Sequence, residues 1–105
     1  MLTVSFFNVR EGQIDQLRAW GRELTRRTDE VEETYRQEGV SHEASYLIEG
    51  KRGWILVFAA ELEHREKARA AYQASTLPID VDHRRVMQAT LNGAFDAELL
   101  YECHL

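Results

Sequence analysis

Cysteine and proline are almost missing from this sequence, which contains one of each, Cys103 and Pro78. A lone cysteine excludes an intrachain disulfide, and the opening residues MLTVSFFNVREG lack the basic start and apolar centre of a signal peptide. Both features predict a cytoplasmic protein. Long hydrophobic runs are absent too: none approaches the roughly 18 residues that span a bilayer, so no membrane partner is expected.

Positive charge is also scarce. Lys and Arg number 13 against 18 Asp and Glu, which gives a net charge of -5 and argues against a nucleic-acid partner. The four histidines and the cysteine show no H-x-H, H-x-x-x-H or C-x-x-C spacing, so no metal site is expected. There is no glycine-rich phosphate loop or nucleotide fingerprint either, and no cofactor is expected.

The length of 105 residues fits a single domain, residues 1–105. Segments rich in β-branched and aromatic residues, or alternating between apolar and polar ones, predict strands. WILVFAA is almost continuously apolar, which is typical of a strand buried on both faces. The four predicted strands are Leu2–Val9, Ser41–Glu49, Trp54–Ala60 and Ala97–Leu105.

Helical periodicity fills the gaps between these strands. Apolar residues recur at steps of three and four after Gln13, which predicts one long helix ending at Gly39. A second helical region is interrupted by Ser75–Pro78, giving pieces over Glu63–Ala74 and from about Asp80 to Leu91. The order β-α-β-β-α-β predicts an α+β, ferredoxin-like fold: a four-stranded antiparallel sheet with its helices on one face.

The predicted strands are apolar on both faces, although the helices can cover only one. Phe7, Ile55 and Val57, with Leu47 or Leu100, would otherwise be in water. Burying apolar surface is favourable by about 25 cal/mol per Å², so we expect a second copy to cover this face. The sequence therefore predicts a homodimer with two sheets face to face.

The hairpin, the stretch VFAAELEHREKARAAYQASTLPIDVDHRRVM and the ending DAELLYECHL resemble the dimeric α/β-barrel superfamily, whose ferredoxin-like chains pair through their sheets. Within it, the chain is most similar to a family of short, uncharacterised prokaryotic proteins with a PID-x-x-H motif. The resemblance covers nearly the whole chain and implies the fold and the homodimer. It leaves the chemistry open, because the superfamily includes cofactor-free monooxygenases, haem-degrading enzymes, sugar mutarotases, decarboxylases and stress-response proteins.

His83, in the PID-x-x-H motif, is the leading candidate for chemistry. With Ile79, Val86 and Thr90 it falls at steps of four and three, on the helix stripe that faces the sheet. One interpretation is structural: Asp80 caps the helix or holds an arginine, and His83 is a core histidine bonded to a neighbour. The other is functional: His83 lines a pocket as a proton donor, proton acceptor or ligand.

Two branches of the superfamily provide comparisons. As haem-degrading enzymes are known, an asparagine on the first strand, a tryptophan on the third and a histidine on the second helical region surround the ligand. Asn8 and His83 occupy similar elements, but Trp54 opens its strand instead of ending it, which argues against haem degradation. The mutarotase histidine and paired aromatics are matched only in part, by His42, Tyr46 and Trp54.

The resulting hypothesis is a homodimer that binds a small organic molecule between sheet and helices, as a cofactor-free oxygenase or isomerase. His83 is the predicted catalytic residue, and Asn8, Tyr46, Trp54 and Asp80 are the predicted ligand-binding residues. The alternative is a noncatalytic binding or assembly protein in which these residues are only core.

Overall fold

A computed structural model describes residues 1–105 as a four-stranded sheet with four helices. None of these helices is both long and apolar enough to cross a membrane. In chain order the elements are β1 (Leu2–Val9), α1 (Ile14–Arg26), α2 (Thr28–Glu38), β2 (Val40–Gly50), β3 (Gly53–Leu62), α3 (Arg65–Ala74), α4 (Pro78–Thr90) and β4 (Leu91–Phe95).

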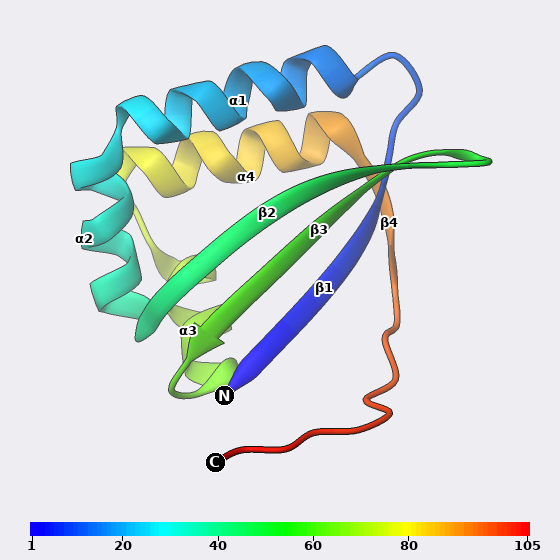
Figure 1. Cartoon of the computed structure of the whole chain (residues 1–105). Helices are drawn as coiled ribbons and strands as arrows, with labels where there is room; N and C mark the ends of the chain where they lie inside the picture. The colour runs from blue at the N-terminus through cyan, green and yellow to red at the C-terminus, as the bar shows by residue number, and fades with distance from the viewer.

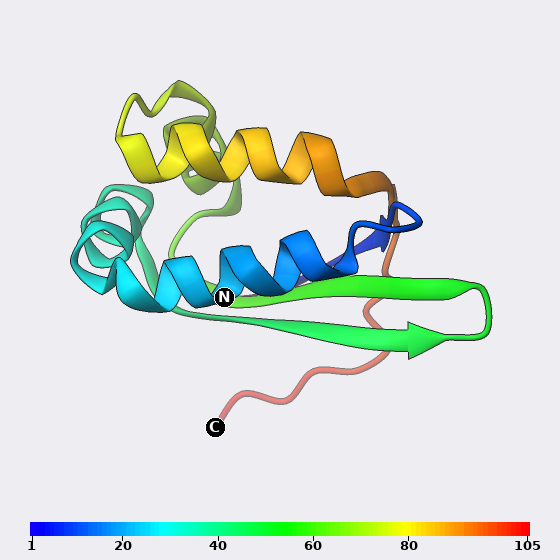
Figure 2. The same cartoon turned by 90° about the horizontal axis from the view of Figure 1, so that it is seen from above.

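The sheet has the strand order β2-β3-β1-β4, and every neighbouring pair is antiparallel (Figure 1). Seen from above, the helices lie on one side of the sheet and the C-terminal tail lies on the other (Figure 2). The predicted α+β class and antiparallel sheet are confirmed, and the architecture is compatible with a ferredoxin-like fold. The interruption of the second helical region is confirmed too, because Ser75 ends α3 and Pro78 opens α4.

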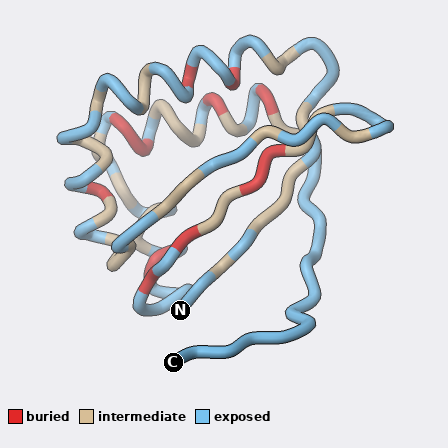
Figure 3. Tube along the Cα trace, viewed as in Figure 1, coloured by how far each residue is buried: buried red, intermediate tan, exposed pale blue.

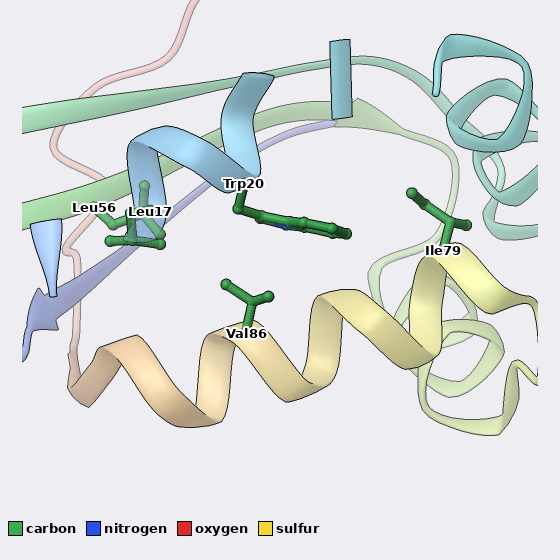
Figure 4. Packing of buried hydrophobic residues seen from close by; sticks show 5 residues of the cluster. All are labelled: Leu17, Trp20, Leu56, Ile79 and Val86. Atoms are coloured by element: carbon green, nitrogen blue, oxygen red, sulfur yellow. The ribbon is translucent and has the colours of Figure 1, made fainter. Parts of the chain in front are cut away.

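The main core lies where α1 and α4 cross the middle of the sheet. Five buried side chains meet there: Leu17 and Trp20 from α1, Leu56 from β3, and Ile79 and Val86 from α4 (Figure 4). Along the chain, the buried positions concentrate on β3 and on the sheet-facing sides of the helices (Figure 3). β3 is flanked by a strand on each side, as the run WILVFAA predicts.

The prediction that Phe7 and Leu47 lie on the face without helices is wrong. Side chains directly opposite in an antiparallel pair share a face, and Phe7 pairs with Leu56 of the core while Phe6 pairs with Val57. Phe7 therefore faces the helices, where its ring contacts that of Phe58, and it is not on the open face. Leu47 also pairs with Leu56 and is covered by helices.

The open face is apolar, as predicted, but with a partly different set of residues. Ile55 and Val57 lie on it, and Val57 is buried. The exposed apolar side chains on this face are Leu2, Val4, Tyr46, Ile48 and Phe95.

The single helix predicted from Gln13 to Gly39 is wrong, because the chain turns at Arg27 and continues as α2 in a new direction (Figure 1). Arg27 leaves helical geometry at φ -100° and ψ 41°, and its side chain pairs with Glu30 and Asp82. The ion pairs stabilise the turn at Arg27, where the periodicity predicts a continuous helix. The predicted end at Gly39 is confirmed by its left-handed conformation, φ 73°.

The predicted strand Ala97–Leu105 is also wrong. The fourth strand is Leu91–Phe95, which follows α4 without a loop and pairs with β1 only from Phe6 to Val9. Beyond it the tail has no regular secondary structure and every residue is exposed. Alternation identifies a segment with one apolar side, but it does not say what that side packs against.

Matched substitutions on α4 test the core. Val86→Ala removes two methyl groups at a position that is 6% exposed and should lower the free energy of unfolding by about 2 kcal/mol. Val81→Ala is the control, because Val81 lies on the same helix and is 47% exposed. Chemical denaturation should show a change within about 0.5 kcal/mol for the control. Equal effects of the two substitutions would contradict this core.

Candidate functional site

A cavity of about 400 Å³ separates the sheet from α2, α3 and α4. Of its 23 lining residues 13 are hydrophobic, so the wall is mostly apolar. The floor comes from Phe7 on β1 and Phe58 on β3, and Val31, Met87 and Leu91 close other sides. A concave, mainly apolar space with a few polar groups is typical of small-molecule sites.

Four polar side chains of the cavity wall form two hydrogen-bonded pairs. The Thr34 hydroxyl on α2 donates to Oδ2 of Asp80 on α4 over 2.6 Å. The Tyr35 hydroxyl donates to the carboxylate of Glu43 on β2, and burial raises the pKa of both groups. No cation pairs with Glu43 or Asp80, and each accepts one hydrogen bond from a hydroxyl group.

Glu38, in the last turn of α2, is less well compensated. Its Oε2 is inaccessible to solvent and has no hydrogen-bond partner. Burial raises the pKa of this carboxyl to about 7, and the nearby Asp80 and Glu43 act in the same direction. Glu38 can therefore gain or lose a proton near neutral pH.

His83 is oriented by the core. Trp20 donates its Nε1–H to Nδ1 of His83 over 2.8 Å, so in the neutral imidazole the proton is on Nε2. Burial lowers the pKa of His83 to about 4, which keeps the ring neutral at physiological pH. The rings of Phe58 and Tyr72 pack near it, with centroids 6.1 and 5.8 Å away, and Nε2 has no partner within the chain.

The predicted site residues are only partly brought together. His83 and Asp80 line the cavity. Asn8 and Tyr46 lie on the open face of the sheet, opposite Ile55 and Val57 respectively. Trp54 is not among the residues that line the cavity.

Trp54 contacts α1 instead, because the Arg18 guanidinium lies 5.1 Å above the centre of its ring. A haem-type grouping of Asn8, Trp54 and His83 is therefore not assembled within this chain. Asp80 does not cap α4 either; its carboxylate accepts from Thr34 instead. Asp82, two residues further along α4, forms ion pairs with Arg27 and Arg85.

Sequence reasoning missed Glu38, Glu43 and Tyr35. Two signals pointed to them: Tyr35 and Glu38 are three residues apart on one helix, and Glu43 alternates on β2 with Ser45 and Leu47, opposite to Tyr46. Both signals are weak, because charged residues at such positions are usually solvated. No group of three or more His, Cys, Asp or Glu side chains is arranged to hold a metal ion.

Comparison with family models gives one match, over residues 2–105, to a family described as a family of unknown function, DUF6176. The chain belongs to this family. No curated protein and no solved structure matches the DUF6176 chain.

The pKa of Glu38 predicts a pH-dependent stability. Between its ordinary value of 4.5 and about 7, the folded chain holds a proton on Glu38 that the unfolded chain has released. This contribution to stability therefore falls as the pH rises through that range and stays low above it. Glu38→Gln should be more stable than the wild type at pH 8, and the gain should shrink toward pH 5.

Chemical denaturation of both proteins at the two pH values measures this difference. Glu33→Gln is the control, because Glu33 lies on α2, is exposed and makes no ion pair. A Glu38→Gln effect that is the same at pH 5 and pH 8 would mean that the carboxyl is not titrating near 7.

Proposed function

We propose that this DUF6176 protein binds a small organic carbonyl compound in the cavity and isomerises it by proton transfer. One observation carries the proposal: Glu38 and His83 line one mostly apolar cavity, where the Glu38 carboxyl makes no hydrogen bond or ion pair and Nε2 of His83 has no partner in the chain. Titratable groups whose pKa values are shifted in opposite directions by their surroundings are a signature of acid–base sites.

Glu38 is the proposed acid–base group. With its pKa near 7, the carboxylate can take a proton from a carbon next to the carbonyl and return it to a neighbouring atom. The mostly apolar wall strengthens the electrostatic interactions between these groups and a bound substrate, because they act in a medium less polar than water. Asp80 and Glu43 support this role because their negative charges favour the protonated form.

His83 is proposed to act as a hydrogen-bond donor. Since Nδ1 is occupied by Trp20, the neutral ring presents Nε2–H to the substrate oxygen. That donor would stabilise the negative charge that develops on the oxygen when the neighbouring carbon loses its proton. The pair thus supplies a base and an electrophile, which an isomerisation needs. A cofactor-free oxygenase would in addition need dioxygen as a co-reactant, so isomerisation is the simpler reaction.

Deuterium exchange tests this chemistry without knowledge of the natural substrate. The protein is incubated in D₂O with a panel of small aldehydes, ketones and oxo acids, and incorporation next to the carbonyl is followed by NMR. At least one compound should exchange faster with protein than in buffer. The rate should rise with pH through about 7 as Glu38 loses its proton.

Variants assign the exchange to the cavity. Glu38→Gln should lower the rate by about 10²- to 10⁴-fold, the usual contribution of a general base. His83→Phe should lower it by about 10²- to 10³-fold, as for loss of an oxyanion donor. Glu33→Gln should leave it unchanged. No exchange across the panel, or exchange that survives both cavity variants, would contradict the proposal and favour a noncatalytic binding or assembly protein.

We also propose that the protein is a homodimer that buries the open face of the sheet. Leu2, Tyr46 and Ile48 are 66%, 59% and 49% exposed there, and several exposed apolar side chains on one sheet face are characteristic of an interface. The C-terminal tail lies on the same side of the sheet (Figure 2), and its residues are exposed, Leu100 by 94%. A second copy would cover both.

Light scattering at micromolar concentration tests the dimer. Ile48→Lys places a charge on the open face and should convert the dimer to a monomer, because an unpaired buried charge is costly. Val81→Lys is the matched control: it is a similar change at an exposed apolar position on α4, away from the open face, and should leave the dimer intact. A wild-type chain that is monomeric at this concentration would contradict the proposal.

A further inference from the structure

Two arginines mark the opening of the cavity. Arg65 and Arg69 are four residues apart on α3, so their side chains lie on one face of that helix, and both line the cavity. Both are also exposed, whereas Thr34 and Asp80 in the cavity wall are buried. A side chain that is exposed and also lines the cavity lies where the cavity meets solvent. Ser45 on β2 is the third such residue, so the charged groups at the mouth are basic, and the wall behind it carries the carboxyl groups.

These two arginines have no partner. Neither makes an ion pair or a hydrogen bond within the chain, although acidic residues outnumber basic ones. Arg26, Arg27 and Arg36 all pair with carboxylates. Three other arginines are likewise unpaired, but none of them lines the cavity: Arg10, Arg22 and Arg52.

We propose that the ligand is a small organic monocarboxylic acid whose carboxylate binds Arg65 and Arg69 at the mouth. Guanidinium groups match carboxylates in charge and geometry, and two on one helix face can hold one carboxylate together. This inference rests on the proposed function and adds the substrate class: an oxo acid, with its carboxylate at the mouth and its carbonyl oxygen toward His83.

The negative charges within the cavity determine which end of the oxo acid lies at the mouth. Glu38, Glu43 and Asp80 disfavour an anion in the interior, so the carboxylate must remain at the mouth. The same three groups disfavour a dicarboxylate, because its second carboxylate would lie in the interior without a counter-ion. A monoanion with an uncharged carbonyl end satisfies both constraints.

Calorimetric titration with pyruvate, levulinate and other short oxo acids, each compared with its methyl ester, tests the inference. Wild-type protein should bind at least one acid more tightly than its ester. The double variant Arg65→Gln/Arg69→Gln should lose at least about tenfold in affinity for that acid, the usual effect of removing a charge-assisted bond, and none for the ester. Arg22→Gln/Arg52→Gln, which removes two unpaired arginines elsewhere, should bind both as the wild type does.

The outcomes separate this inference from the proposed function. Esters that bind as tightly as acids, phosphate monoesters or amines that bind more tightly, or acid binding that survives Arg65→Gln/Arg69→Gln would overturn the carboxylate assignment alone. Oxo compounds would then still bind in a manner sensitive to Glu38→Gln and His83→Phe. If no acid and no ester binds, both the inference and the proposed function are wrong.

Discussion

The hydrogen bond from Trp20 to His83 links the core of this protein to its cavity. Trp20 packs among the buried side chains between α1 and α4, and its Nε1–H is held by an imidazole that lines the cavity. The Arg27 guanidinium lies 6.0 Å from the centre of the Trp20 ring and pairs with Asp82, the residue before His83. The turn between α1 and α2, the packing of α1 on α4 and the orientation of His83 therefore depend on the same few side chains.

The buried carboxyl groups have a cost that the fold itself does not explain. An unpartnered acceptor such as Oε2 of Glu38 costs about 1–3 kcal/mol, and a fold under selection for stability alone would place an apolar residue or a donor there. Local departures from structural optimum concentrate at functional sites. Together with the mostly apolar wall and the neutral His83, this cost is the physical reason for assigning a ligand to the cavity.

The sequence predicted features that depend on short-range patterns. The bounds of β1, the central place of β3, the interruption before Pro78 and the inward position of His83 all follow from alternation, helical steps or proline chemistry. Features set by distant residues were missed. The turn at Arg27 contains no glycine or proline and is held by Asp82 from another helix. The only local signal was the change from basic Arg26 and Arg27 to acidic residues in the next turn.

Two other features were missed because they depend on residues that are distant in the sequence. The face on which Phe7 lies depends on strand register, and Glu38 is unusual only because of what surrounds it in space.

The tautomer and the pKa of the His83 ring test directly whether Trp20 orients this imidazole in the cavity. Nitrogen NMR of the imidazole across a pH titration reports which nitrogen carries the proton and at which pH the second one binds. We predict the Nε2–H form at neutral pH, with Nδ1 accepting a hydrogen bond from Trp20, and a pKa near 4. A proton on Nδ1, or an unshifted pKa near 6.5, would contradict both the orientation of the ring and the role proposed for it.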